Sequence, residues 1–504
     1  MTTLATARAA GRAHFETHFD IILVALFAVA AVLLVGLASM APPILGLLLV
    51  GALMGAAVTA VVIVWPPAAA YFFLATMPFL AGVERGAVLP LVRPNEAVQF
   101  LLGGALIVRA LALFVGGHRF PLRLSTMEIA LLVMAICGSF LPLGWLVIRE
   151  RGLPFSEILA TVPLWRYVAL YLLIRMSIST EAQVRTCLWI GLLGACAVSL
   201  IAIAQVLNIG PTQAIINRFW TPGGVANAVA SGRGTATLSS SHATGDVLSF
   251  NIAVVLGLLL MTDMQRLVKL FAIGVAALLV LGTLASAQFS GALSLMTVLG
   301  VVAITMRRVR EVLIGGAVAA FAGGILLWPV ISIRLSEFGD RGLPQSWAVR
   351  FDNLATFYIP DLVNFGWILG VRPDSVVPAP EDWRVLIFLE SGYLWLLWVG
   401  GVPLLLSFIW FVTSGMRQTF GTARLRNDAI GVAALGGLSS LAALTILMLF
   451  DPHLTIRGAG DTLFTLLALA AVPAAAGARA SNPPDRRDVT TDAARRLEPR
   501  GALP

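Results

Sequence analysis

Charged side chains are scarce in this sequence. They make up 12% of its 504 residues, whereas hydrophobic residues make up 59%. Soluble globular domains carry about 25% charged residues, so the composition excludes an ordinary soluble protein. Apolar runs of about 20 residues, the length that a helix needs to cross a bilayer, recur along the chain. The sequence therefore predicts an all-α fold, a polytopic transmembrane helical bundle.

Cysteine, histidine and nucleotide-binding motifs are sparse or missing. All three cysteines lie in apolar runs, which excludes a disulfide framework: Cys137, Cys187 and Cys196. With five histidines and neither a C-x-x-C nor an H-E-x-x-H motif, no metal site and no cofactor are predicted. Lys269 stands between Val268 and Leu270, so there is no Walker A element. The net charge of +8 comes largely from arginines in short connections, which indicates membrane topology rather than binding to nucleic acid.

About 12–14 apolar runs are predicted to span the membrane. They are residues 19–40, 44–65, 68–83, 97–115, 127–148, 159–178, 186–207, 243–261, 267–285, 290–306, 312–333, 387–412, 429–450 and 461–476, of which the third and tenth are short enough to be re-entrant.

Arginine placement predicts the orientation of these runs. If residues 1–18 are cytoplasmic, alternate connections are basic, and the tail 477–504 also falls inside, as a disordered segment. Transmembrane helices then occupy 19–333, with an outer loop at 208–242, and again 387–476, after a large outer loop at 334–386. A short outer connection at 451–460 separates the last two runs. We expect the protein to lie in the cytoplasmic (inner) membrane as a multi-pass protein, with both termini in the cytoplasm.

The loop 334–386 mixes charges of both signs with aromatic residues. After Pro344, the spacing of Trp347, Phe351 and Tyr358 is nearly helical, and it ends before Pro360. This pattern predicts an amphipathic helix lying on the membrane or over a cavity. The alternative is an ordinary structured loop.

The loop 208–242 carries a second polar group. Arg233 lies among small residues in Ser-Gly-Arg-Gly-Thr, which would let a phosphate approach both its guanidinium fork and the backbone. Asp246 begins an apolar run, where an ionisable group is costly and often functional. The plainer alternatives are a loop arginine and a helix-start aspartate. Three arginines inside apolar runs are expected to extend toward lipid headgroups: Arg109, Arg166 and Arg175.

The order of these features resembles the O-antigen ligase and polymerase superfamily. The resemblance covers roughly residues 210–410: an Arg-Gly-Thr element at 233–235 before a span, a late loop with Arg350 before Leu-Gly-Val-Arg-Pro at 369–373, and a span opened by Glu390-Ser391-Gly-Tyr-Leu and a Gly-Gly pair. Two departures matter. Ligases of this superfamily have His-Asn where Glu390-Ser391 stand, which favours a polymerase. The family's Ser-Arg-Gly element lacks its arginine at 286–291.

The resemblance implies a metal-independent glycosyltransferase that polymerises undecaprenyl-diphosphate-linked oligosaccharide repeat units outside the cytoplasmic membrane. It implies that arginines bind the diphosphate. Arg233 and Arg350 are the first candidates, and Arg372 and Arg334 are the next. Glu390 is the candidate base and His242 its rival, although Glu390 could instead pair with a loop arginine such as Arg384. Membrane lipids, a chain-length regulator and export proteins are candidate partners.

Two other functions are kept open. The first is a ligase that transfers the glycan to another acceptor. The second is a flippase or other transporter of the lipid-linked oligosaccharide. A transporter is expected to carry its polar groups near the middle of the bilayer, whereas here they gather at one face.

Overall fold

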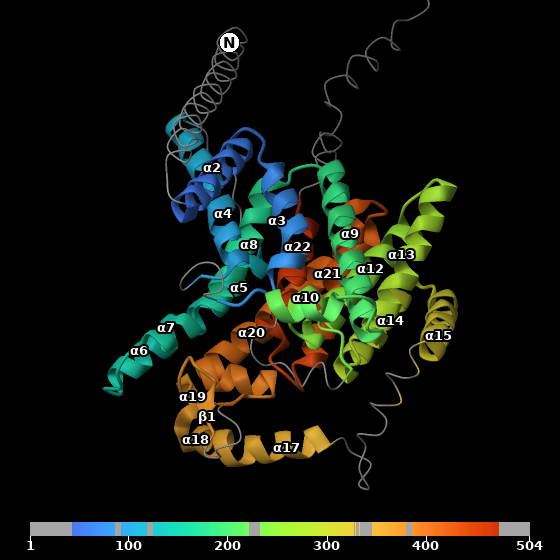
Figure 1. The fold of residues 1–504 in the computed structure, drawn as a ribbon. Coiled ribbons are helices and arrows are strands. Elements are labelled where there is room, and N and C mark those ends of the chain that lie inside the picture. The colour runs from blue at the N-terminus through green and yellow to red at the C-terminus, as the bar shows by residue number, and fades with distance from the viewer. Residues whose placement is uncertain are drawn as a thin grey trace, which may run out of the picture.

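The computed structural model describes residues 43–85, 92–117, 124–220, 232–326, 345–379 and 386–472, with the single residues 328 and 332. Most of the described residues are helical (Figure 1). The strands found in these ranges are two antiparallel dipeptides, β1 (Val377–Pro378) and β2 (Leu386–Ile387). The predicted all-α fold class is confirmed, and the protein is a multi-pass membrane protein.

Within the described ranges, nine helical stretches are long and apolar enough to cross a membrane. They are α4 (Pro94–Val115), α5 with α6 (Thr126–Cys137, Phe140–Ile148), α7 with α8 (Phe155–Ala160, Val162–Ser177), α9 (Glu181–Val206), α12 (Ser241–Met261), α13 (Arg266–Ala285), α14 (Phe289–Met306), α20 (Gly392–Leu425) and α21 (Ala429–Leu447).

Four further apolar helices accompany these spans: α2 (Pro43–Val64), α3 (Pro67–Leu80), α15 (Val309–Leu326) and α22 (Ala459–Ala470). The first predicted span, 19–40, lies outside the described residues. The predicted span 127–148 is broken at Gly138-Ser139, where α5 ends and α6 begins.

Polar residues and proline mark several helix starts. Ser125 accepts a hydrogen bond from the backbone of Glu128 at the start of α5, and Asp428 accepts one from Gly431 at the start of α21. Proline occupies the first turn of α3, α4 and α8, where its missing N–H costs no helical hydrogen bond. These signals explain why the helix boundaries follow the sequence closely.

The centre of the bundle is formed by α12 and α21, which are the most buried of the spans. Helix α12 contacts α9, α13, α14, α21 and α22. Small residues permit the close approach of α14: a Cβ added to Gly245 would lie 3.0 Å from the Cα of Gly291. Polar side chains at the start of α12 are therefore enclosed by neighbouring helices.

The late loop folds as a chain of short helices at one end of the bundle, at the bottom of Figure 1. They are α17 (Gln345–Asn353), the π-helical turn η2 (Leu354–Tyr358), α18 (Ile359–Asp361), the π-helical turn η3 (Leu362–Gly366) and α19 (Trp367–Leu369). The predicted helix after Pro344 is present, but its predicted end before Pro360 is wrong. Pro360 falls in the first turn of α18, where it does not interrupt the helical path.

Two glycines fasten this loop to α20. Gly370 has φ +91°, and a Cβ there would lie 2.5 Å from the carbonyl oxygen of Val399. Gly401, at φ +63°, marks a kink in α20. A Cβ added there would clash with the carbonyl oxygen of Ile368. The backbone N–H of Val371 also donates to the carbonyl of Trp398 at 2.7 Å. Only glycine tolerates both the backbone angles and the close contact, so these contacts fix the loop against the bundle.

Arginines inside the apolar runs are paired with protein groups. Arg166 is buried, and its Nη2 lies 2.7 Å from Asp461 Oδ1 on α22. Arg175 Nε lies 3.7 Å from Glu128 Oε1, and Arg109 donates to the backbone carbonyl of Ile63. The expectation that Arg166 extends toward lipid headgroups is wrong, because a carboxylate on a later helix neutralises it inside the protein.

Candidate functional site

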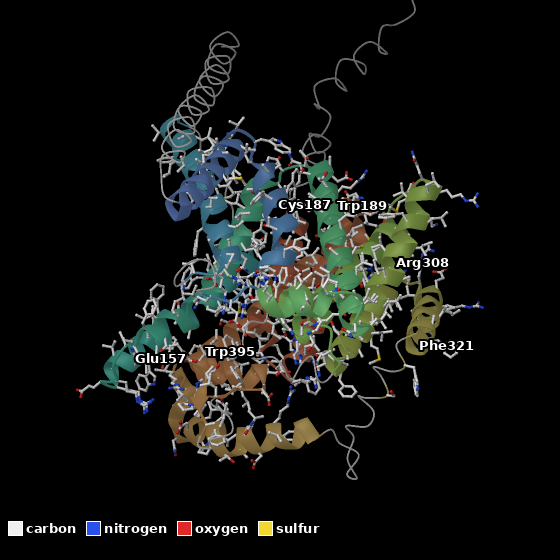
Figure 2. All side chains as sticks on the ribbon, viewed as in Figure 1. Glu157, Cys187, Trp189, Arg308, Phe321 and Trp395 are labelled. Atoms are coloured by element: carbon white, nitrogen blue, oxygen red, sulfur yellow. The ribbon has the colours of Figure 1, made fainter. Side chains whose placement is uncertain are left out.

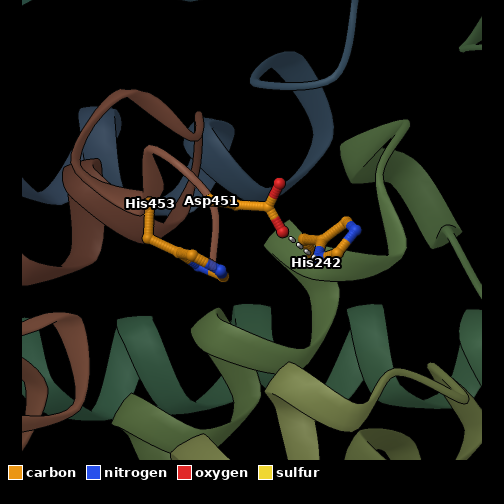
Figure 3. Close-up of side chains that lie close together, drawn as sticks. All are labelled: His242, Asp451 and His453. Carbon is orange, nitrogen blue, oxygen red and sulfur yellow. Dashed lines mark ion pairs between the residues drawn. The ribbon is translucent and has the colours of Figure 1, made fainter. Parts of the chain in front are cut away.

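Charged and polar side chains from four separate segments meet at the end of the bundle that faces α17. They come from the start of α12, from α17, from the residue pair before α20, and from the connection between α21 and α22, which contains the short helix η4 (His453–Thr455). We call this group the histidine cluster: His242, Asp246, Arg350, Glu390, Asp451 and His453. Figure 3 shows three of its members, His242, Asp451 and His453, close together.

Local capping and pairing bring these segments together. The Ser240 hydroxyl accepts from the backbone of Ala243 and starts α12 at Ser241, so that His242 and Asp246 stand four residues apart on one helix face. The backbone N–H of Gly392 donates to the carbonyl of Met448 at 2.8 Å. This bond joins the start of α20 to the end of α21, and it places Glu390 beside Asp451.

The deepest part of the cluster is a carboxylate–imidazole pair. His453 Nδ1 lies 2.5 Å from Asp246 Oδ2, and both side chains are fully buried. Because a carboxylate only accepts, Nδ1 donates in this bond. Burial lowers the pKa of His453, but the charge and hydrogen bond of Asp246 outweigh it, so the pKa is raised above its ordinary value. The other ring nitrogen, Nε2, is buried without a hydrogen-bond partner in the described part of the chain.

A second layer nearer the surface is organised by Arg350. Its Nε lies 3.4 Å from Glu390 Oε2 and its Nη1 lies 3.2 Å from Asp451 Oδ2. All three side chains are partly exposed. Burial raises the pKa of Glu390, the positive charge of Arg350 opposes this, and the negative charge of Asp451 adds to it, so the net shift is upward. The Glu390 carboxyl therefore takes up a proton more readily than an exposed glutamate.

His242 stands between the two layers. Its Nδ1 lies 3.1 Å from Ser290 Oγ and 3.9 Å from Asp451 Oδ2. The ring meets that of His453 edge-to-face, with centroids 5.9 Å apart. Its side chain is 25% exposed, whereas that of His453 is fully buried. His242 is therefore the histidine of the cluster that a bound substrate can reach.

Three members of the cluster offer metal ligands. One ligand atom each from His242, Asp451 and His453 lies within 4.8 Å of the other two. The hydrogen bond from His453 to Asp246 is also the arrangement that commonly orients a metal-bound imidazole. Against this, the guanidinium of Arg350 already supplies positive charge to Asp451 at 3.2 Å. The residue types fit Zn²⁺, and Arg350 competes with it.

Three of the residues predicted from the sequence come together in this cluster: His242, Arg350 and Glu390. Arg372 does not join them, because its Nη1 lies 3.9 Å from Glu157 Oε1 on α7. Figure 2 shows Glu157 near the end of the bundle that carries α19. Arg233 lies half-buried in the segment leading to α12. Arg334 and Arg384 lie outside the described residues.

Asp451 and His453 were not predicted as site residues, although His453 was expected on the same face as His242. They occupy a short connection without a recognisable motif, and 207 residues separate His453 from its partner Asp246. One signal pointed to them. A carboxylate such as Asp246 inside an apolar run requires a partner, and the histidines predicted on that face were few.

The comparisons with known proteins do not assign the chain to a group. No family model matches it, and no curated protein matches it either. The similarity to the O-antigen ligase and polymerase superfamily therefore stays a prediction from short motifs and their order.

Proposed function

We propose that the protein is an integral membrane glycosyltransferase that polymerises undecaprenyl-diphosphate-linked oligosaccharide repeat units into a surface polysaccharide or exopolysaccharide. It acts at the outer face of the cytoplasmic membrane, with both termini in the cytoplasm. One observation carries the proposal: a reachable histidine, an arginine and two carboxylates converge at one end of a membrane bundle. These groups can supply the proton acceptor and the positive charge that transfer from a lipid diphosphate to a hydroxyl uses.

In the proposed reaction, an acceptor hydroxyl attacks the anomeric carbon of the donor glycan. The new glycosidic bond forms, the bond from that carbon to the diphosphate oxygen breaks, and the diphosphate leaves with the electron pair. His242 accepts the hydroxyl proton at Nε2, while Ser290 and Asp451 face its Nδ1. Arg350 stabilises the charge that develops on the diphosphate.

Glu390 and the buried pair have supporting roles. In the resting site the charge of Arg350 is balanced by Glu390 and Asp451. The negative charge of an arriving diphosphate favours the protonated form of Glu390, whose pKa burial already raises, and loss of that carboxylate charge would release Arg350 to the substrate. His453 and Asp246 are positioning residues, since their bond holds the connection that carries Asp451.

The test uses full-length protein in detergent, extracted lipid-linked repeat units and no nucleotide sugar. We expect a ladder of longer glycans on the lipid. His242→Gln should lower the rate about 100-fold or more, as expected for loss of a general base. Arg350→Lys keeps the charge but loses the forked donor, and it should also remove most activity. Asp352→Asn, at an exposed position on the same helix as Arg350, is the matched control and should behave as wild type.

The outcomes separate this proposal from its alternatives. If folded protein forms no ladder until a different acceptor is added, the protein is a ligase. If no transfer occurs with any acceptor, a transporter is favoured, because detergent removes the compartments that transport needs. A chelator should leave the ladder unchanged, and loss of the ladder would instead give His242, Asp451 and His453 a metal-binding role.

A further inference from the structure

The connection between α21 and α22 carries residues of the histidine cluster and also Arg457, which belongs to a second charged group. Four arginines from separate segments contribute to it: Arg85 after α3, Arg93 at the start of α4, Arg166 on α8 and Arg457 just before α22. Two carboxylates accompany them, Glu96 on α4 and Asp461 on α22. We call these six residues the arginine cluster.

The geometry joins these groups through the two carboxylates. Glu96 Oε1 lies 3.3 Å from Arg85 Nη2 and 3.9 Å from Arg93 Nη1. Asp461 Oδ1 lies 2.7 Å from Arg166, and its Oδ2 accepts the backbone N–H of Gly458 at 3.0 Å. That last bond sets the position of the neighbouring Arg457.

Positive charge is in excess within the cluster. Its four guanidinium groups face two carboxylates, which leaves a surplus of two, and the exposed Glu84 nearby lowers this to one. Within the described chain, Arg457 makes no hydrogen bond or ion pair, and its Nη1 is buried. Arg457 is half-buried, and withdrawing part of a cation from water without a partner costs free energy, so an anion bound here would stabilise the arrangement.

The neighbouring charges act in the same direction. Burial, together with the positive charge of Arg457, lowers the pKa of Arg93 to about 10. Burial and the charge of Arg166 also lower the pKa of Arg457. An anion bound between these side chains would relieve their mutual repulsion.

The surroundings indicate a lipid as the carrier of that anion. Helix α4 continues from Glu96 to Phe100 and Leu101, whose side chains are exposed on the apolar surface. A phosphate held by the arginines would therefore have lipid-facing protein surface beside it for its apolar chain. Guanidinium groups bind phosphate oxygens through paired, charge-assisted hydrogen bonds.

We propose that Arg85, Arg93 and Arg457 form a binding site for the phosphate or diphosphate headgroup of a membrane lipid, separate from the histidine cluster. Arg166 is paired with Asp461 and adds positive charge near the site. The groups that act electrostatically on Arg457 include Arg166, Glu96, Tyr167 and Glu84, together with Arg93. None of these residues belongs to the histidine cluster.

If the ligand is a lipid diphosphate, this site belongs to the proposed polymerase and rests on that function. A polymerase handles two lipid-linked substrates at once, so it needs a second place for a lipid diphosphate. The connection 451–458 would link the two sites, because it carries Asp451 and His453 toward one and Arg457 toward the other. The other possible ligand is an anionic phospholipid.

Native mass spectrometry of the full-length protein tests this site. Wild type would be titrated separately with undecaprenyl diphosphate, phosphatidylglycerol and phosphatidylcholine. Arg457→Gln should weaken binding of a phosphate-bearing lipid about tenfold or more, as expected for loss of a charge-assisted contact. Because Arg457 makes no hydrogen bond or ion pair in the described part of the chain, this variant should still fold. Arg185→Gln on α9 removes an equally charged but exposed arginine, and it should leave binding unchanged.

Three outcomes decide the matter. Preferential binding of a second undecaprenyl diphosphate, beyond the one expected at Arg350, that Arg457→Gln abolishes identifies a carrier-lipid subsite, and the same variant should then shorten the glycan ladder. Equal, Arg457-dependent binding of phosphatidylglycerol identifies a general anionic-lipid site. Binding that does not distinguish phosphatidylcholine from the other lipids, or an unchanged number of bound lipids in Arg457→Gln, overturns the proposal. Lipid binding is measured without catalysis, so its failure is distinct from failure of the polymerase assay.

Discussion

Replacement of Asp246 by asparagine isolates the electrostatic role of the buried pair. The bond to His453 is 2.5 Å long and both side chains are fully buried, so the change removes a charge while keeping the shape. In the wild type, Asp246 raises the pKa of His453 against the effect of burial. In Asp246→Asn, burial prevails and the pKa of His453 falls. Asp451 and Arg350 also face this histidine and are unchanged.

The sign of the pH dependence follows from this change. In the wild type the folded-state pKa of His453 lies above its unfolded value of about 6.5. The stabilisation from the pair is therefore complete below that value, and it is lost as pH rises through the folded-state pKa. In Asp246→Asn the folded-state pKa of His453 lies below its unfolded value. Stability should therefore rise with pH until the pH exceeds the unfolded pKa. Loss of a hydrogen bond between charged groups should cost about 2 kcal/mol in slightly acidic solution.

Tryptophan fluorescence during heating of the detergent-purified protein, at a series of pH values, measures this effect. Ser249→Ala is the matched control, because Ser249 lies on the same helix and its buried hydroxyl has no partner in the described chain. The control should unfold as wild type does and show the same pH profile. An unchanged pH profile in Asp246→Asn would refute the assignment of charge to this pair.

Three other variants test separate parts of the structure. Glu390→Gln removes one neutralising partner of Arg350, so diphosphate binding should no longer depend on the protonation of Glu390 and should vary less with pH. If binding by this variant varies with pH as it does in the wild type, Glu390 does not control the release of Arg350. Gly370→Ala forces a φ of +91° on a residue with a Cβ, which should destabilise the protein by about 1–3 kcal/mol before any clash, and thermal unfolding would show it. Arg372→Gln and Glu157→Gln should each leave the glycan ladder intact. A double-mutant cycle of the free energy of unfolding should show a coupling of about 0.5–1 kcal/mol between them. Loss of the ladder in Arg372→Gln would mean that Arg372 belongs to the site.

The sequence predicted the fold class because apolar runs and helix caps act locally. The bend between α5 and α6 and the continuation past Pro360 were missed. Neighbouring helices decide whether glycine breaks a span, and a proline in a first turn is compatible with a helix. Local patterns do not show which distant helix faces which.

The same limit applies to the site. Arg350 and Glu390 were predicted from motif order, and the ion pair between them depends on the way the late loop folds back onto α20. Asp451 and His453 were missed because their significance comes from Asp246, on a helix far away in sequence. Arg166 was misassigned for the same reason, since its partner Asp461 lies 295 residues further along the chain. Long-range charge pairing was the part of the structure that sequence patterns did not predict.

These two long-range pairs have a consequence for biosynthesis. Asp246 and Arg166 enter the membrane long before their partners exist, because the partners lie 207 and 295 residues later. At translation rates of about 5–20 residues per second, each remains without its partner for roughly 10–60 seconds. An unpaired charge at the centre of a membrane helix costs roughly 2.5–3.5 kcal/mol on insertion scales, and Asp246 and Arg166 lie nearer the starts of their helices. A chain that stops before His453 therefore keeps both charges inside its bundle without their partners, and this state distinguishes an unfinished protein from a complete one for membrane quality control.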